Sequence, residues 1–107
     1  MIIIYGKFIK RRYLYEMIRK YKNKSPSIHK TAYIDEQATI IGDVTVGSDS
    51  ALWPQAVARG DISSIIIGDR TNIQDGAILH VTHQSEYSKE YPLKIGNDVT
   101  IGHSAIL

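Results

Sequence analysis

A spacing of six residues between aliphatic side chains is the feature that most constrains the fold. From Tyr33 onward, aliphatic residues recur at this spacing in three successive frames. The frames are Ile34, Ile40, Val46, Leu52 and Ala58, then Ile67, Ile73 and Leu79, then Ile95, Ile101 and Leu107. A period of six fits neither a helix nor a simple alternating strand. It predicts an all-β fold, a parallel solenoid with three short strands and about 18 residues per coil.

A second series of smaller residues accompanies the first. It consists of Ala38, Val44, Ser50, Ala56, Thr71, Ala77, Val99 and Ala105. We expect both series to point inward, the smaller residues near the corners. Glycine follows the large residue at Gly47, Gly68, Gly96 and Gly102, and we expect it to permit the turns. An antiparallel β protein with accidental spacing is the alternative, but eleven aliphatic positions in three frames argue against it.

The breaks between frames locate two insertions. Leu52 and Ile73 are 21 residues apart, so about three residues are inserted near RGDISS, residues 59–64. One coil later the spacing is 28 residues, so about ten are inserted. We place these in the polar segment THQSEYSKEYP, residues 82–92, as a surface loop.

Composition excludes several classes of protein. The chain has no cysteine, which excludes disulfides and thiolate metal sites and favours a cytoplasmic location. The longest apolar run near the start is Ile2–Ile4, so we expect no membrane span. Residues 1–24 hold eight Lys and Arg and one acid, whereas the remainder holds five basic and ten acidic residues. We expect this basic segment to be solvated and not to bind nucleic acid, because no RNA-stacking or DNA-reading motif accompanies it.

Two histidines occupy related places in the repeat. His80 follows the inward Leu79. One coil later, Leu107 takes the position equivalent to Leu79, so the residue stacked on His80 would be the one after Leu107. His103 lies five residues before that position, about 16 Å of extended chain. Zinc binds imidazole nitrogen at about 2.0–2.1 Å. His80 and His103 of one chain therefore should not share a metal, but they could share one across a subunit contact, and a three-sided prism suits a threefold axis.

Three segments carry a resemblance to a known family: LWPQAVARGD, IGDRTNIQDGAILH and PLKIGNDVTIGHSAIL. From about Met17 to Leu107 the sequence resembles the γ-class carbonic anhydrases and their bacterial carbonic-anhydrase-like branch. The resemblance implies a left-handed parallel β-helix of hexapeptide repeats with a C-terminal helix, assembled as a homotrimer. Residues 1–16 fall outside the family pattern and are expected to be an N-terminal extension.

The resemblance also implies a metal site, made of three histidines at the subunit interface, two from one chain and one from the next. It points to His80 and His103 as ligands of zinc, with iron or cobalt as alternatives, and to a third ligand directly after Leu107. The chain thus resembles a fragment that stops before its last coils and closing helix. The implied reaction is reversible hydration of CO2 to bicarbonate by metal-bound hydroxide, which we expect to be impaired without the third ligand.

Polar residues near the histidines receive roles from the same resemblance. The implied catalytic set is Gln74, Asp61 and Arg59. Gln74 is expected to hydrogen-bond the metal-bound water or bicarbonate. Arg59 and Asp75 are expected to pair across the interface, with Asp61 joining that network, so that these charged residues chiefly assemble the trimer. The 21-residue coil independently stacks position 80 on Arg59.

Several other residues receive only structural assignments. Asn72 is expected to form a turn, although it could share the role of Gln74. We expect His83 to be an exposed loop residue rather than a proton shuttle, and we assign no function to Trp53. Ile62 stands where the founding branch of the family carries a proton-transferring glutamate, which argues against fast turnover.

Two other functions remain open. A hexapeptide-repeat acyltransferase would share the fold and work at subunit interfaces, but it would not need RGD together with NIQD. A non-catalytic scaffold protein would need neither metal nor acyl donor. Fold alone does not decide among these functions, whereas metal binding or acyl-CoA binding would.

Overall fold

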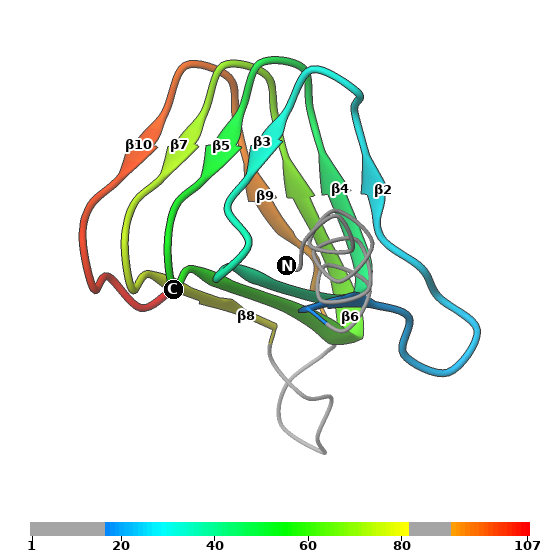
Figure 1. Ribbon diagram of the computed structural model, residues 1–107. Coiled ribbons are helices and arrows are strands. Elements are labelled where there is room, and N and C mark those ends of the chain that lie inside the picture. The colour runs from blue at the N-terminus through cyan, green and yellow to red at the C-terminus, as the bar shows by residue number, and fades with distance from the viewer. Residues whose placement is uncertain (1–16, 82–90) are drawn as a thin grey trace, which may run out of the picture.

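The computed structural model describes residues 17–81 and 91–107, which form a parallel β-solenoid (Figure 1). Every pairing between its strands is parallel. The strands are β1 (Ile18–Arg19), β2 (Ser27–Ile28), β3 (Tyr33–Ile34), β4 (Thr39–Val46), β5 (Ala51–Leu52), β6 (Val57–Ile67), β7 (Asn72–Ile73), β8 (Ile78–His80), β9 (Leu93–Ile95) and β10 (Thr100–Ile101). The all-β solenoid predicted from the six-residue period is therefore confirmed.

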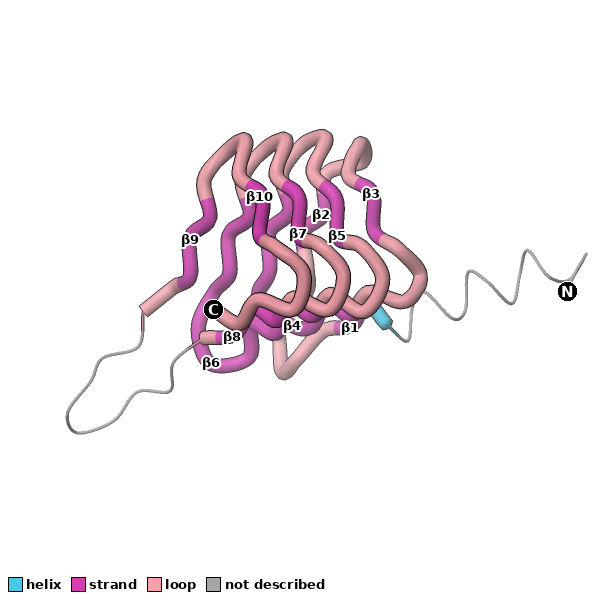
Figure 2. Tube along the Cα trace, turned by 90° about the vertical axis from the view of Figure 1, so that its left-hand side faces the viewer, coloured by secondary structure: helices cyan, strands magenta, loops and turns pink. Residues whose placement is uncertain are grey.

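The strands make three faces, which can be followed from coil to coil in Figure 2. Face 1 consists of β1, β8 and the first halves of β4 and β6. Face 2 consists of β2, β9 and the second halves of β4 and β6. Face 3 consists of β3, β5, β7 and β10. The two long strands, β4 and β6, continue round the corner between faces 1 and 2.

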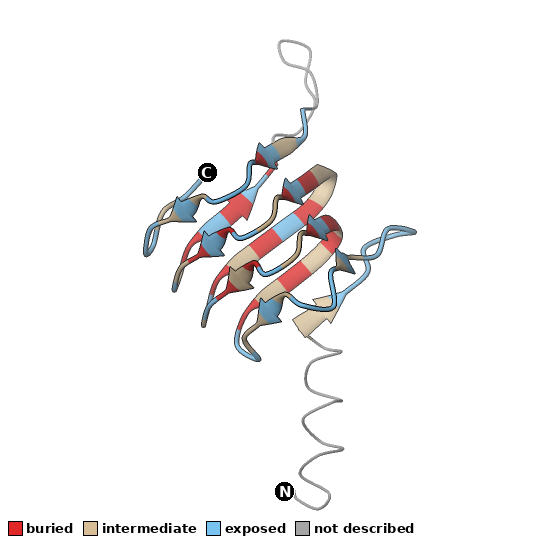
Figure 3. Cartoon of the chain, turned by 90° about the horizontal axis from the view of Figure 1, so that it is seen from above, coloured by how far each residue is buried: buried red, intermediate tan, exposed pale blue. Residues whose placement is uncertain are grey.

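The core fills the inside of the prism, and along much of the strands buried residues alternate with intermediate or exposed ones (Figure 3). The large series is buried at Ile40, Leu52, Ile67, Ile73 and Leu79, as predicted. The smaller series is buried at Ala38, Val44, Ser50, Ala56, Thr71 and Ala77. Burying one large aliphatic side chain stabilises a fold by about 1.5–3 kcal/mol. Each repeat therefore stabilises the fold by burying its own large aliphatic side chain.

The first predicted insertion is visible as a break in register between β4 and β6. Gly42 pairs with Gly60, but Val44 pairs with Ile65, so β6 has three more residues than β4 in this interval. The extra residues lie opposite Asp43 at the corner between faces 1 and 2, and we term this corner, with residues 43 and 60–64, the bulge corner. It forms where the sequence predicted it.

The second predicted insertion falls between Val81 and Leu93, because Ile67 pairs with Ile95 across a 28-residue spacing. Residues 82–90, which include His83, lie outside the described residues. The same holds for residues 1–16, the expected N-terminal extension.

The predicted role of glycine in the turns is wrong at the corner between faces 2 and 3. Left-handed backbone occurs there at Asp49, Arg70 and Asp98, with φ of 56°, 52° and 59°. Gly68 is needed instead for close approach of the coils, because a Cβ on it would lie 2.6 Å from the carbonyl oxygen of Gly96. We term this corner, residues 47–50, 68–71 and 96–99, the ladder corner.

Candidate metal centre

His80 lies exposed at the end of β8 on face 1. β8 pairs with β6 so that His80 stacks on Arg59, as predicted. The next coil continues this register, because Ile78 pairs with Ile106 and the Leu107 amide donates to the Ile78 carbonyl at 3.0 Å. The stack on His80 would thus continue with the residue that follows Leu107.

His103 lies at the corner between faces 3 and 1, which we term the histidine corner (residues 53–56, 74–77 and 102–105). Its side chain is 67% exposed, and its Nε2 is 3.8 Å from Oδ1 of Asp75. The backbone fixes this arrangement, because the Ser104 amide donates to the Asp75 carbonyl oxygen at 3.0 Å. His103 therefore stacks directly on an acidic residue of the preceding coil.

The two histidines belong to different stacks on the surface of one chain. His80 shares its stack with Arg59, and His103 shares its stack with Asp75. Within residues 17–81 and 91–107, no three His, Cys, Asp or Glu side chains come together in a group that could hold a metal. Imidazole nitrogen suits zinc, iron or cobalt. Because both rings are exposed at the surface, the donor set fits a metal where two protein surfaces meet.

Arg59 pairs with Asp61 inside the chain, with Nε 3.4 Å from Oδ2. The guanidinium side chain remains 48% exposed, whereas Asp61 is only 19% exposed. The other carboxylate oxygen, Oδ1, is buried and has no hydrogen-bond partner among the described residues. The predicted pair of Arg59 with Asp75 does not form within the described part of the chain. It remains a prediction for a contact between chains.

Gln74 directly follows β7 and is half-buried, and its side chain makes no hydrogen bond to the described residues. Asn72 corrects a prediction, because it lies in β7 and not in a turn. Its Oδ1 accepts a hydrogen bond of 3.0 Å from the Trp53 indole. The two amides project from the same side of face 3, because they are two residues apart in extended chain. Sequence reasoning missed Trp53 as the partner of Asn72.

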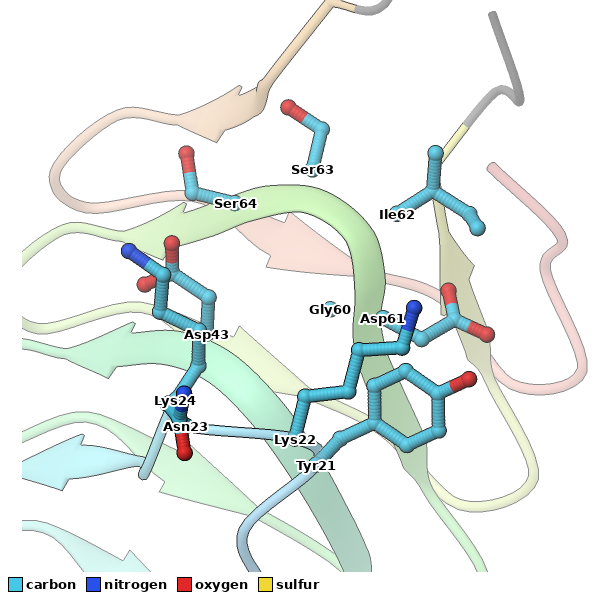
Figure 4. Close-up of a pocket in the computed structure, with 10 residues that line it drawn as sticks. All are labelled: Tyr21, Lys22, Asn23, Lys24, Asp43, Gly60, Asp61, Ile62, Ser63 and Ser64. Carbon is cyan, nitrogen blue, oxygen red and sulfur yellow. The ribbon is translucent and has the colours of Figure 1, made fainter.

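A hollow of about 470 Å³ opens at the bulge corner, beside the turn Tyr21–Lys24 (Figure 4). Asp43 and the corner residues Gly60–Ser64 line its other sides. The three extra residues of β6 are among this lining. Neither His80 nor His103 lines it, so it does not coincide with the predicted metal site.

Comparison with solved structures defines the class of fold. A putative acetyltransferase from Bacillus cereus is 48% identical and superposes with a TM-score of 0.71, over 81% of this chain and 47% of that one. A hexapeptide transferase family protein from Anaplasma phagocytophilum is 41% identical with the same TM-score. That match covers 81% of this chain and 47% of the other. The chain is thus a hexapeptide-repeat β-solenoid.

Sequence comparison narrows the class. No family model matches the chain. Protein YrdA of Escherichia coli is 46% identical over 86% of this chain and 50% of its own length. A carbonic anhydrase of Geobacillus kaustophilus is 44% identical over 85% and 47%, and gamma carbonic anhydrase 1 of Arabidopsis thaliana is 42% identical over 79% and 31%. The chain belongs to the γ-carbonic-anhydrase-like family of hexapeptide-repeat proteins, and it spans half or less of the length of these relatives.

Proposed function

We propose that this chain is part of a metalloprotein that interconverts CO2 and bicarbonate at a contact between subunits. The observation that carries the proposal is the division of the predicted site into two stacks. One stack holds Arg59 and His80, and the other holds Asp75 and His103. Each stack has one imidazole, and their charged residues are of opposite sign. In a rotationally symmetric oligomer, the Arg59–His80 stack of one subunit could face the Asp75–His103 stack of its neighbour. Each contact would then bring together two imidazoles and a pair of opposite charges.

The outward side of face 1 supports such a contact. Val57, Ile78 and Ile106 stack on one another there, next to the stack of Arg59 and His80. Ile78 is 38% exposed and Ile106 is 74% exposed. An apolar ladder on an outward face is typical of surfaces that are covered by another protein. A second and third copy of the chain, in the homotrimer implied by the family, would cover it.

Each polar residue then has a distinct task. His80 of one subunit and His103 of the next would hold the metal, for which zinc is our first expectation and iron or cobalt the alternatives. When bound, zinc would supply the acidity that makes water a nucleophile near neutral pH. Gln74 directly precedes Asp75, on which His103 stacks, and its amide makes no hydrogen bond to the described residues, so it would orient water or bicarbonate by hydrogen bonding.

The charged residues would hold the subunits in register. Arg59 and Asp75 would pair across the contact, and Asp61 would keep the guanidinium in place through its Oδ2. Because Arg59 is half exposed and Asp75 is exposed in the single chain, both can reach a neighbour. The proposal does not need either residue to transfer a proton.

The test compares zinc content and molecular mass for two proteins: the 107-residue chain, and the same chain continued past Leu107 with the C-terminal coils of E. coli YrdA. We expect the longer protein to be a trimer with about one zinc per subunit contact. His80→Ala and His103→Ala should each lose most of that zinc. His29→Ala is the matched control, because His29 hydrogen-bonds to Thr31 outside the proposed site. A longer protein without zinc, or one that keeps its zinc in His80→Ala, would refute the site.

Acyl transfer is the second candidate, because the Bacillus cereus neighbour is described as a putative acetyltransferase. Binding of acetyl-CoA by metal-free protein, measured by calorimetry, would favour it. If neither zinc nor acetyl-CoA binds, a scaffold role is the better reading. No helix among the described residues is long and apolar enough to cross a membrane.

A further inference from the structure

Trp53, the one tryptophan of the chain, is held on two sides on face 3. Its indole Nε1 donates to Oδ1 of Asn72 at 3.0 Å. Its ring contacts Tyr33, with ring centroids 5.1 Å apart and a tilt of 43°. The side chain is nevertheless 38% exposed. Two directional contacts therefore fix the orientation of an aromatic residue that burial alone would leave mobile.

The bond from Trp53 determines which end of the Asn72 amide is free. An indole N–H only donates, so it can pair only with the amide oxygen. The Nδ2 group of Asn72 keeps both hydrogens, and neither has a partner among the described residues. Gln74, in contrast, has no hydrogen bond that fixes its amide. Of the two amides at the proposed site, one is oriented before any ligand arrives.

The amides of Asn72 and Gln74 lie beside the next coil. Asn72 pairs with Thr100 of the next coil. Gln74 lies below Gly102, because its amide donates to the carbonyl of Ile101. Thr100 and Gly102 thus flank the two amides on the next coil, and Thr100 is exposed like Asn72.

We propose that Trp53 is a positioning residue of the site, which orients Asn72 so that its NH2 group, and not its oxygen, is available to an oxyanion. The oxyanion would be bicarbonate, so the inference rests on the proposed function. If the amide rotated by half a turn, its oxygen would face the negative charge of the ligand and repel it. Trp53 prevents that rotation, because the rotated amide would offer NH2 to a group that cannot accept a hydrogen bond.

The kinetic test uses the zinc-loaded longer protein described above. Trp53→Phe keeps the aromatic contact with Tyr33 but removes the indole donor. We expect KM for bicarbonate to rise about fivefold, the worth of one hydrogen bond, with kcat changed less than about twofold and zinc content unchanged. Tyr33→Phe is the matched control, because it removes a hydroxyl that bonds Asp35 on the same face and leaves the Trp53 bond intact. An equal rise in both variants would mean that packing, and not the indole bond, is responsible.

A double-mutant cycle separates positioning from a general structural role. In the Asn72→Ala background, Trp53→Phe should raise KM no further, because there is no amide left to orient. Asn72→Asp should weaken bicarbonate more than Trp53→Phe does, because it still accepts the indole bond but offers no donor and carries a negative charge. A full fivefold effect of Trp53→Phe in the Asn72→Ala background would overturn the proposal.

A second readout needs no metal. The single indole N–H gives one resonance in the 107-residue chain, and its hydrogen exchange should be about fivefold slower than in Asn72→Ala. Equal exchange rates would show that the bond does not persist in solution, and the proposal would fail. Zinc content distinguishes the two kinds of failure. A longer protein without zinc refutes the proposed function, whereas zinc with normal KM in Trp53→Phe refutes only the role of Trp53.

Discussion

The ladder corner and the histidine corner have similar backbones but use their side chains in opposite ways. Both turn through left-handed residues, at Asp49, Arg70 and Asp98 in one, and at Gln55, Gly76 and Ser104 in the other. At the ladder corner, side chains bond the backbone of the neighbouring coil. At the histidine corner, the side-chain polar contacts between coils in the described residues join side chain to side chain: His103 with Asp75 at 3.8 Å, and Trp53 with Asn72 at 3.0 Å.

The bonds of the ladder corner leave few polar atoms available. Ser50 Oγ donates to the Gly68 carbonyl at 2.6 Å and accepts from the Thr71 amide at 2.9 Å. Thr71 Oγ1 in turn donates to the Gly96 carbonyl at 2.7 Å. Asn97 Oδ1 accepts from the Asp69 amide at 2.8 Å. Polar groups that are satisfied inside the chain stabilise it but cannot bind a ligand, so a solenoid of this kind can separate stability from function by corner.

The largest expected effect concerns glycine at the ladder corner. Gly68→Ala should lower the free energy of unfolding of the 107-residue chain by about 3 kcal/mol, because the new Cβ would meet backbone of the next coil 2.6 Å away. Gly96→Ala is the matched variant at the same corner one coil later and should change it by less than about 0.5 kcal/mol, since nothing lies within 4 Å of its Cβ position. Urea unfolding measures both. Equal losses would show that contact between coils does not explain the cost at Gly68.

A smaller difference is expected for serine. Ser50→Ala should lower the free energy of unfolding by about 1–3 kcal/mol, because it leaves the buried Thr71 amide and Gly68 carbonyl without a side-chain partner. Ser104→Ala should cost less than about 0.5 kcal/mol, since its exposed hydroxyl makes no hydrogen bond to the described residues. Unfolding midpoints in urea give the comparison. A cost at Ser104 that matches the cost at Ser50 would contradict the division between the corners.

The register between neighbouring coils was predictable from the sequence, because it depends only on the number of residues between equivalent positions. Stacked coils repeat every 18 residues plus any insertion, so the three extra residues at the bulge corner place His80 on Arg59. The inward positions followed from the same count and are buried in the middle coils, whereas Ile34 and Ile101 are only partly buried and Leu107 is 47% exposed. Residue spacing does not depend on side-chain rotamers, which is why these predictions are confirmed.

Contacts across the surface were not predictable in this way. The bond from Trp53 to Asn72 runs diagonally between neighbouring strands and depends on two rotamers. The left-handed residues at the ladder corner are Asp, Arg and Asp, of which arginine carries no signal for such a conformation. The ligand roles of His80 and His103 remain predictions, because in one chain the two rings lie in separate stacks.

The smallest expected effect concerns the ion pair on the outside of the ladder corner. Arg70 Nε lies 2.8 Å from Asp98 Oδ1, and a second bond of 3.2 Å joins the same two groups. The hydrogen bond from Arg70 lowers the pKa of Asp98 below its ordinary value of 3.8, although desolvation opposes the shift. A carboxyl whose pKa is lower in the folded state stabilises the fold above its ordinary pKa, and this contribution is lost as the pH falls through the folded-state value.

Asp98→Asn should therefore lower the melting temperature slightly at pH about 7 and by less at pH about 2. The loss at neutral pH should be smaller than that of Ser50→Ala, because both members of the pair are more than half exposed and solvent screens them. Arg70→Gln should reproduce this pH profile, and the double variant should add nothing further. If the melting temperatures of wild type and Asp98→Asn differ equally at both pH values, the pair does not couple this corner to pH. The stability of the ladder corner then rests on its buried hydrogen bonds alone.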